Sequence, residues 1–364
     1  GAADMDMGAP PELAGRLDGA TALWRMRRVL GYFGGSHGRT AAEFASTLRD
    51  PTLARVFESL FLPDAPMWFL YMLFGLLAGG QLGLLARGCE GFVLPIESLY
   101  RQLGGRVEYG RTVDRILIEE DRVIGVRTDD GRVHRADAVI AAGDAHRTLL
   151  AMLDPRLVDE AARARLDTWR TTVPWVIVSL GVGRTFPGEP HLTTYRLAEP
   201  LTVGRAPVTE LCVRVFNYSP HFAPEGKTVI QPSFESDWDH WHGLHERDPM
   251  AYRQEKERVA SEVIRRLEAH HTGLSSQIEV VDVATPWTTY RYTLNARGAY
   301  MGWLPTATQL QTALPRTLPG LSGFVMAGQW VVPGGGVPTC LQSGRDAVRI
   351  LCRRDGVRFR AAEG

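Results

Sequence analysis

Near the end of the chain, the spacing of apolar residues changes from a strand pattern to a helix pattern. Phe324 to Ala327 form a short apolar run, which predicts a buried strand. Gly328 ends this run, and Gly334 to Gly336 follow in a glycine-rich loop that leads to Val337 and Pro338. Further on, apolar residues recur along one side of a predicted helix at Leu341, Ala347, Val348 and Leu351. The pattern therefore predicts a strand, a glycine loop and a helix in succession.

These three elements together predict a corner that can bind an anion or a flat ligand. The first N–H groups of a helix lack partners within the helix and lie at the positive end of its dipole. Glycine lets bare backbone approach a ligand, and Pro338 suits the first helical position because its missing N–H costs nothing there. A glycine-rich turn without a ligand fits the same residues equally well. The segment lacks the Lys that a P-loop requires.

A second patterned block begins at Arg87 and predicts a helix followed by a β-meander. The helix is expected from Pro95 to Leu103, where Gly104 and Gly105 end it. A turn is expected at Asp129 to Gly131. The expected strands are Arg106–Tyr109, Arg115–Glu119, Val123–Thr128, Val133–Ala136 and Ala138–Ala142.

The middle of the chain predicts a second sheet. Asp248 to His270 has apolar residues at helical spacing and predicts a long helix, while Leu23 to Phe33 predicts another near the start. Thr40 and Glu43 have the spacing of a capping box. The expected strands of the second sheet are Thr172–Gly183, Glu210–Phe216, Lys227–Pro232 and Gln277–Thr285.

Ala65 to Ala86 is uncharged over 22 residues, which is long enough to cross a bilayer. The paired glycines Gly79 and Gly80, the polar Gln81 and the lack of a second such segment argue against a span. We therefore expect a buried helix or one that touches a membrane, beside an apolar substrate channel.

Composition and charge limit the classes of molecule that the protein is expected to bind. The 364 residues are 45% hydrophobic and 23% charged, and the formal net charge is zero, so nothing favours nucleic acid as a partner. The four cysteines show no CxxC pairing, and reduced thiols are expected. No secretory signal is visible. We expect a cytoplasmic protein, either free or peripheral on the inner face of the membrane through residues 65–86.

A cluster of histidines and aspartates lies in the segment DWDHWHGLH, which contains Asp237, His240, His242 and His245. Histidine is a common metal ligand, but the spacing matches no helical metal pair, and we expect no metal. We expect a loop here that enters the helix starting near Pro249. No GxSxG or HExxH motif is present, and no catalytic residue is named.

The segment AGQWVVPGGGVPTCLQSGRDA resembles the carboxy-terminal flavin motif of the phytoene desaturase, carotenoid isomerase and retinol saturase group of FAD-dependent oxidoreductases. The helix and meander after Arg87 resemble the same family. The resemblance implies FAD as cofactor, with the loop and helix start against the flavin ring and Gln329 near the ribityl-phosphate chain. The cofactor-binding residues it implies are Val113, Ala142, Gly143, Gly328, Gln329, Trp330, Gly334, Gly335, Gly336, Val337 and Pro338.

The chain departs from the family pattern in two places. Gly88 to Phe92 reads GCEGF, where the family usually shows a Pro and paired glycines. No strand followed by GxGxxG and a helix, which would hold the pyrophosphate, is present. The resemblance begins near residue 30, so we expect an amino-terminally truncated enzyme whose 364 residues bind FAD weakly or not at all.

The expected fold class is α/β (α+β), an incomplete Rossmann-like FAD/NAD(P)-binding domain with a substrate domain of mixed or antiparallel sheet and helices. The predicted division places a helical part of the substrate domain at 1–87, a helix and meander of the FAD-binding domain at 88–165, the rest of the substrate domain at 166–317 and a final FAD-binding segment at 318–364.

The resemblance implies an FAD-dependent oxidoreductase that acts on C–C or C=C bonds of a hydrophobic, isoprenoid-like small molecule. Five aromatic residues, each of which fits an ordinary core as well, are candidates to line its channel: Tyr290, Tyr292, Tyr300, Trp303 and Trp330. One alternative is a flavin amine oxidase, with Trp330 and Tyr300 in an aromatic cage. Another is a lipid-binding or prenyl-binding module without flavin.

Overall fold

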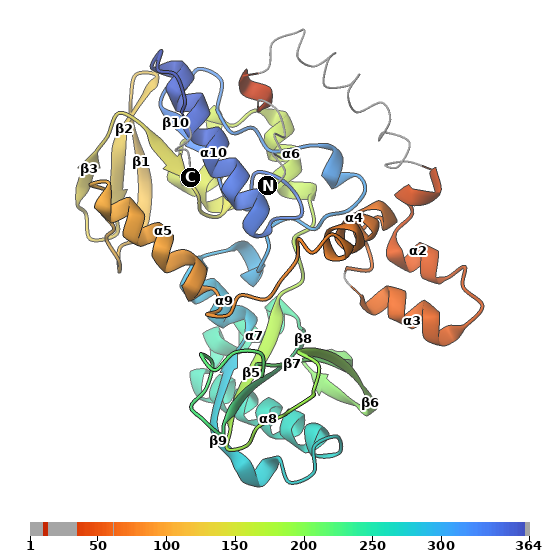
Figure 1. Cartoon of the computed structure of the whole chain (residues 1–364). Helices are drawn as coiled ribbons and strands as arrows, with labels where there is room; N and C mark the ends of the chain where they lie inside the picture. Colours follow the sequence, from red (N-terminus) through yellow and green to blue (C-terminus); the bar gives the residue numbers. More distant parts are fainter. Residues whose placement is uncertain (1–9, 14–34, 61, 361–364) are drawn as a thin grey trace. The chain divides into compact units, whose positions relative to one another are not determined.

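The computed structural model describes residues 10–13, 35–60 and 62–360, which form two compact units (Figure 1). The first unit contains Gly1–Gly79, Gly110–Thr172 and Met301–Gly364, and the second contains Gly80–Tyr109 and Val173–Tyr300. Each unit is thus assembled from chain segments that lie far apart in the sequence.

The first unit combines a small parallel sheet, an antiparallel meander and several helices. Its strands are β1 (Val113–Glu119), β2 (Arg122–Thr128), β3 (Val133–Arg135), β4 (Val139–Ala141) and β10 (Phe324–Met326). Its α-helices are α2 (Ala41–Ala45), α3 (Pro51–Ser59), α4 (Met67–Ala78), α6 (Glu160–Thr168) and α10 (Gly336–Arg354). Its short helical turns are η1 (Pro11–Leu13), η2 (Gly35–Gly38), η3 (Arg147–Met152), η4 (Pro155–Leu157) and η7 (Gln309–Gln311).

The antiparallel meander β1-β2-β3 confirms the predicted order of strands. Val113 pairs with Thr128 at one end of β1, and Glu119 pairs with Arg122 at the other. Gly131 has a φ of +81° in the turn between β2 and β3, a conformation that glycine adopts at little steric cost.

The capping box predicted at Thr40 is also confirmed. The Glu43 N–H donates to Thr40 Oγ1 at 3.0 Å, and the Thr40 N–H donates to Glu43 Oε2 at 2.8 Å. Two donors at the start of α2 are satisfied in this way. The helix predicted from Leu23 to Phe33 lies outside the described residues.

The uncharged stretch near residue 70 forms only one short helix, α4. Gly79 and Gly80 follow its end, and Gly80 has a φ of +67°. Met67 and Leu70 are buried, whereas the rest of the helix is partly or largely exposed. Among the residues that the structure describes, no helix is both long and apolar enough to cross a membrane. Peripheral membrane contact stays a prediction.

The second unit contains a five-stranded sheet and most of the longer helices. Its strands are β5 (Trp175–Val182), β6 (Leu192–Val203), β7 (Ala206–Val215), β8 (Thr228–Glu235) and β9 (Ile278–Ala284). Its helices are α5 (Glu90–Gln102), α7 (Trp238–Arg247), α8 (Pro249–Glu268) and α9 (Pro286–Thr293), with the turns η5 (Ser275–Gln277) and η6 (Ala296–Gly298).

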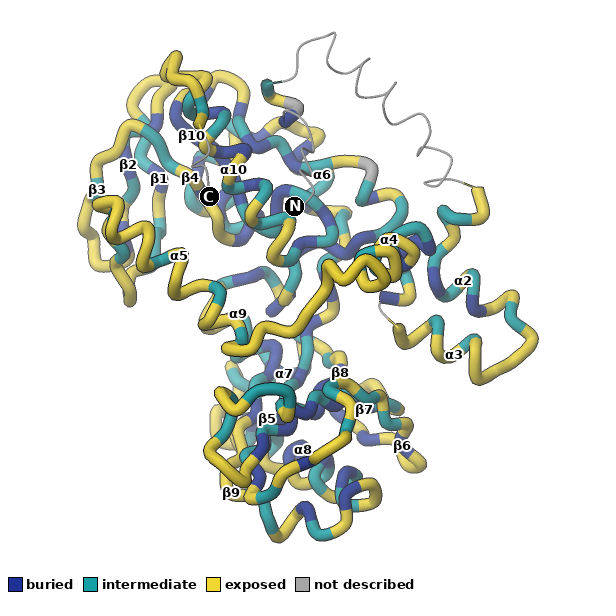
Figure 2. Tube along the Cα trace, viewed as in Figure 1, coloured by how far each residue is buried: buried dark blue, intermediate teal, exposed yellow. Residues whose placement is uncertain are grey.

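The sheet of the second unit is antiparallel throughout, in the order β6-β7-β8-β5-β9. Every second residue of β5 is buried, from Val176 to Val182, and Val259, Val263 and Leu267 of α8 belong to the same core (Figure 2). Fully burying each of these side chains stabilises the fold by roughly 1.5–3 kcal/mol before entropy is counted. The four predicted strands of this sheet are confirmed, while β6 was not predicted.

The predicted strand from Arg106 to Tyr109 is wrong, because these residues have no regular structure. They contact helix α5 instead. The Tyr109 hydroxyl donates to Glu97, and Arg101 Nη2 donates to the Val107 carbonyl at 3.4 Å. Helix α5 itself begins at Glu90, earlier than predicted.

The predicted loop before Pro249 is also wrong, because residues 238–247 form helix α7. Asp237 caps α7 and Asp248 caps α8, so each aspartate starts a helix. The histidines of α7 face different partners, with His242 stacked on Trp238 and His245 stacked on Trp287. Within residues 10–13, 35–60 and 62–360, no group of three potential ligands has the geometry of a metal site.

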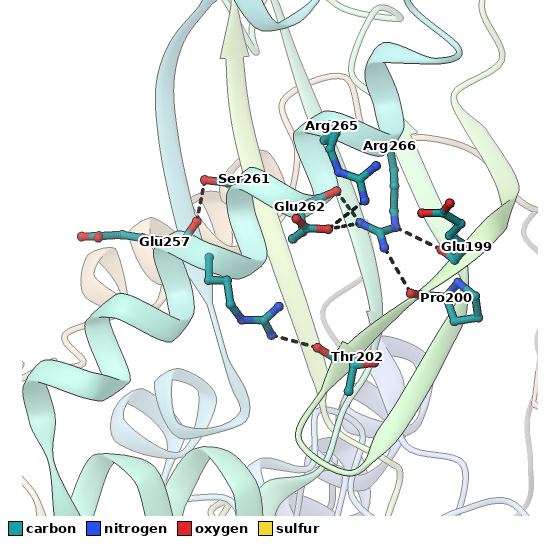
Figure 3. Close-up of polar contacts among 9 residues, drawn as sticks. Glu199, Pro200, Thr202, Glu257, Ser261, Glu262, Arg265 and Arg266 are labelled. Atoms are coloured by element: carbon teal, nitrogen blue, oxygen red, sulfur yellow. Dashed lines mark hydrogen bonds and ion pairs between the residues drawn. The ribbon is translucent and has the colours of Figure 1, made fainter.

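The edge strand β6 has an irregular register between Arg196 and Leu201. Two arginines of α8 bind backbone carbonyls of β6 within this segment and just after it (Figure 3). Arg266 donates to the Glu199 and Pro200 carbonyls, and Arg258 donates to the Thr202 carbonyl at 2.8 Å. These contacts occupy carbonyl groups on a strand that has only one neighbour in the sheet.

We expect the second unit to lose stability as pH falls below about 6.5. The Tyr195 hydroxyl lies 3.1 Å from Nε2 of His271, which is buried, and burial lowers the pKa of His271 from its usual 6.5. The unfolded chain therefore binds a proton that the folded chain does not, and the loss is complete below the folded pKa. Urea unfolding between pH 7.5 and 5.5 should show a smaller pH dependence in His271→Gln than in His270→Gln, which changes an exposed neighbour. An equal dependence in both variants would contradict this assignment.

Candidate functional site

The candidate site begins at two parallel strands, β4 and β10. Val325 pairs with Ile140 and Met326 with Ala141, and the Ala327 N–H donates to the Ala141 carbonyl at 2.9 Å. Their carboxyl ends therefore lie side by side. In open α/β sheets, ligands bind in the crevice outside such carboxyl ends. Of the predicted site residues, Ala142 and Gly143 follow β4, while Gly328, Gln329 and Trp330 follow β10.

Gly328 brings the two chain segments into close contact. Its φ is +89°, and a Cβ at this position would lie 3.0 Å from the Ala142 carbonyl oxygen. Its N–H donates to Oγ of the buried Ser343 at 2.7 Å, which fixes the turn against α10. A side chain here would be strained and crowded, so this glycine has a structural role whether or not a ligand binds.

Trp303 and Trp330 form a buried support for the segment after β10. Their ring centroids lie 4.9 Å apart with an interplanar angle of 89°, and Trp303 Nε1 donates to the Trp330 carbonyl at 2.8 Å. Gly302 allows this approach, because a Cβ there would lie 2.9 Å from the Gln329 carbonyl oxygen. The sequence predicted Trp303 only as a channel or core residue and not as a support for Trp330. The pair Gly302-Trp303 was the sequence signal for this support.

The glycine loop is held by the same segment. A Cβ on Gly335 would lie 2.2 Å from the Met301 carbonyl oxygen, and the Gly334 N–H donates to the Trp303 carbonyl at 3.2 Å. Helix α10 begins directly afterwards at Gly336, and no side chain caps it. Pro338 is thus the third residue of the helix, whereas the sequence predicted it at the first position. It still lies in the first turn, where N–H groups have no helical partner.

Two glycines of the site are open. A Cβ added to Gly143 or to Gly336 would meet no atom within 4 Å. Gly143 is exposed and lacks a positive φ, so no strain or crowding explains a glycine there. Bare backbone after β4 and the uncapped start of α10 are both features that suit a flat, electron-rich group such as a flavin.

Val113 lies near the segment that follows β4. Arg147 Nη2 donates to the Val113 carbonyl at 3.5 Å, and Arg147 also donates its backbone N–H to Asp144 at 2.8 Å. The start of β1 is thereby connected to the residues just after Gly143. The contact between Val113 and an adenine stays a prediction.

A buried ion pair anchors α10 to the chain before β10. Arg316 Nη2 lies 3.3 Å from Asp346 Oδ2, and both side chains are less than a tenth exposed. Burial raises the pKa of Asp346, while Arg316 opposes that change. Burial also raises the pKa of the Cys340 thiol on the same helix, which favours the unreactive protonated form.

The aromatic residues predicted to line a channel are distributed over both units. Trp303 and Trp330 lie in the core of the first unit. Tyr300 packs edge to face against Trp175 with ring centroids 6.0 Å apart, and Tyr290 packs against Trp238 at 5.3 Å. Tyr292 is exposed. The channel stays a prediction.

Two parallel strands that end side by side, with a glycine loop leading from one of them into an uncapped helix, are features of dinucleotide-binding α/β folds. The model of one protein family, described as flavin containing amine oxidoreductase, matches residues 12–352. The chain therefore belongs to the flavin containing amine oxidoreductase family. Membership of this family confirms the predicted FAD cofactor, and the predicted fold class is also confirmed.

The chain is similar to enzymes of carotenoid metabolism. It is 26% identical over 335 residues to the zeta-carotene-forming phytoene desaturase of Myxococcus xanthus, covering 85% of this chain and 61% of that protein. It is 24% identical over 270 residues to the chloroplastic prolycopene isomerase of Arabidopsis thaliana, covering 73% of this chain and 43% of that protein. The predicted resemblance is confirmed, and the chain spans about half the length of these relatives.

Solved structures share the fold. An oxidoreductase from Methanosarcina mazei superposes with a TM-score of 0.55 at 18% identity, covering 92% of this chain and 74% of that one. A protein from Pyrococcus furiosus gives a TM-score of 0.52 at 16% identity, covering 93% and 75%. At these identities the likeness concerns the fold alone.

Proposed function

We propose that this chain is the later part of an FAD-dependent oxidoreductase that acts on C–C or C=C bonds of an isoprenoid or similar lipid, as a desaturase, isomerase or saturase. One observation carries the proposal. The parallel strands β4 and β10 end side by side, the open Gly143 follows β4, and the glycine loop after β10 leads into the uncapped start of α10. The carotenoid-processing relatives favour a hydrocarbon substrate.

In this proposal the residues of the chain place the cofactor and supply little acid–base chemistry. A bound flavin would accept or return a hydride at the hydrocarbon. The N–H groups at the start of α10 would favour negative charge on it by roughly 0.3–1 kcal/mol, and Gln329 would lie near its ribityl-phosphate chain. Residues 88–165 and 318–364 would belong to the flavin-binding part, and residues 1–87 and 166–317 to the substrate part.

The pyrophosphate contacts would come from a strand–GxGxxG–helix unit, a motif that the 364 residues do not contain. The chain alone should therefore bind FAD weakly. The chain fused behind such a unit should carry flavin with its visible absorbance. In the absence of oxygen, an acyclic polyene should either reduce this flavin or be recovered with its double bonds altered. Amines should leave the flavin oxidised. A fused protein that holds flavin but alters no polyene would contradict the proposed substrate class.

Amine oxidation is the second candidate, because the family model is named for it. Its predicted cage requires an exposed Trp330, and Trp330 is 1% exposed. Reduction of the flavin by an amine, with release of hydrogen peroxide in air, would favour this candidate. Binding of isoprenoid without any flavin would favour the lipid-binding module.

We expect Gly143→Ala to weaken FAD binding about tenfold in the fused protein, the effect of roughly 1–3 kcal/mol of overpacking at a ligand contact. The fold should not change, because the new methyl group meets no protein atom. Fluorescence titration with FAD measures the affinity. Gly344→Ala is the matched control, since its Cβ also meets no atom but lies within α10. Equal affinities for the two variants would place the flavin away from Gly143.

A further inference from the structure

His146 contacts both chain segments that form the candidate flavin site. It follows Gly143 in the segment directly after β4. The centroid of its ring lies 5.9 Å from the ring of Trp330, which follows β10. The same imidazole lies 5.1 Å from the ring of Trp303, which supports Trp330. A change at this imidazole therefore reaches both segments of the site.

The two ring nitrogens of His146 have different surroundings. Nε2 lies 3.0 Å from the Leu166 carbonyl oxygen on α6. A carbonyl group only accepts hydrogen bonds, so Nε2 must carry a hydrogen atom and donate it. In the neutral imidazole, Nδ1 is then a bare acceptor. Nδ1 is buried, and within the part of the chain that the structure describes it has no hydrogen-bond partner.

The group closest to Nδ1 that could pair with it is the carboxylate of Asp144, which is an acceptor as well. Nδ1 lies 3.9 Å from Asp144 Oδ1, and the Asp144 side chain is 2% exposed. The same oxygen accepts the Arg147 backbone N–H at 2.8 Å, so this carboxylate holds the turn directly after Gly143. Two buried acceptors opposite each other are unfavourable, whereas a proton on Nδ1 makes one of them a charged donor.

Other charged side chains near this turn and along the end of α6 are engaged elsewhere. The guanidinium groups of Arg147 and Arg163 bond to backbone carbonyls. Arg165 lies over a tryptophan ring, and Asp167 is exposed. The two tryptophans that contact the imidazole carry no charge. Asp144 is therefore the charged group that responds to a proton on Nδ1.

From this geometry we infer that His146 is a proton-sensitive positioning residue for the candidate flavin site. A proton taken from solvent by Nδ1 forms a charged hydrogen bond to Asp144 and holds the turn of Gly143 against the segment of Trp330. Loss of this proton leaves two acceptors opposed and loosens the turn. Histidine changes its charge between about pH 5 and 8. The consequence for flavin rests on the proposed function, because Gly143 and Trp330 belong to the proposed site.

The first measurement uses the purified chain without FAD, so it does not depend on the proposed function. Proton–nitrogen NMR of the imidazole, assigned by its loss in His146→Gln, shows which nitrogens carry hydrogen at each pH. We expect hydrogen on Nε2 alone at high pH and on both nitrogens at low pH. Hydrogen exchange of residues 141–148, corrected for the intrinsic effect of pH, should be slower in the protonated form.

Asp144→Asn is the second variant for this measurement. Its amide oxygen still accepts the Arg147 N–H, while its amide N–H is a donor for the neutral Nδ1 of His146. Corrected exchange of residues 141–148 should therefore lose its pH dependence in Asp144→Asn. Hydrogen on Nδ1 alone in the neutral wild type, or a pH dependence as strong in Asp144→Asn as in the wild type, would overturn the inference.

The second measurement is the FAD affinity of the fused protein at pH 6 and pH 8. We expect about fivefold tighter binding at pH 6, the lower end of couplings between linked sites, and no such difference in His146→Gln. His134→Gln on β3 changes another histidine of the same unit and should keep the wild-type difference. Equal pH dependence in these two variants would contradict the inference. A fused protein that binds no FAD at either pH would contradict the proposed function instead, and the NMR result would still decide the role of His146.

Discussion

Gly335→Ala is expected to destabilise the first unit by about 3 kcal/mol, the upper range for overpacking. The added Cβ would lie 2.2 Å from the Met301 carbonyl oxygen, 2.9 Å from Met301 Cγ and 3.1 Å from the Met301 carbonyl carbon. Two of these atoms are backbone, so a side-chain rotation cannot relieve the contact. The glycine loop or the segment around Met301 must move instead. The loop precedes the start of α10, and the segment around Met301 includes Trp303, which supports Trp330.

Urea unfolding followed by hydrogen exchange of peptides from the first unit measures this loss. Gly344→Ala is the control, because it lies inside α10 with open space around its Cβ. It should be neutral, or stabilising by up to about 1 kcal/mol through higher helix propensity. A Gly335→Ala protein as stable as Gly344→Ala would show that the approach of Met301 to the loop is not tight in solution.

Gly335 has two possible roles, cofactor binding and a close contact within the protein, and the sequence alone does not separate them. Gly335 was predicted to bind cofactor, and the structure gives it a contact within the protein that already requires glycine. Lost flavin binding in Gly335→Ala would therefore follow from either role. Gly143 has no such internal contact, which makes its substitution the informative test of the site.

The elements of the candidate site that depend on local pattern could be predicted from the sequence. The run from Phe324 to Ala327 became β10, and the glycine loop leads into α10. The meander and the long helix α8 were predicted because their apolar periods are regular over several turns or strands. The N-terminal cap at Thr40 was predicted because its side chain bonds to its own helix.

The parts that could not be predicted depend on contacts between distant segments. Trp303 Nε1 bonds to the carbonyl of Trp330, 27 residues away, and the Thr172 N–H bonds to the Gly302 carbonyl, 130 residues away. Local spacing carries no signal of such pairs. Helix α7 was missed because its histidines and aromatic residues face several neighbours and leave no single apolar stripe. Strand β6 was missed because polar residues fill much of it and its register is irregular.

The contact between α8 and β6 illustrates how an irregular strand is held by long-range polar bonds. Arg266 is only 10% exposed, and its guanidinium donates to carbonyls of Glu199 at 3.2 Å and Pro200 at 3.1 Å. It also donates to the Glu262 carbonyl at 3.0 Å and is paired with the Glu262 carboxylate (Figure 3). The neighbouring Arg265 binds the same carboxylate at 3.0 Å but is 56% exposed, whereas Arg266 also bonds to carbonyls of β6. The two arginines therefore form a natural pair of test and control.

Arg266→Met, which keeps an apolar stem and removes the guanidinium, should lower the free energy of unfolding of the second unit by about 2 kcal/mol. Arg265→Met should lower it by less than about 1 kcal/mol, as is usual for an exposed ion pair. Bonds to Arg266 and then Arg265 lower the pKa of Glu262 to about 2, and Arg266→Met should raise that pKa more than Arg265→Met. Urea unfolding and carboxyl titration by NMR measure both effects. Equal losses in the two variants would mean that the carbonyl bonds to β6 add nothing beyond the ion pair, and that the irregular segment is held by its own strand pairing with β7.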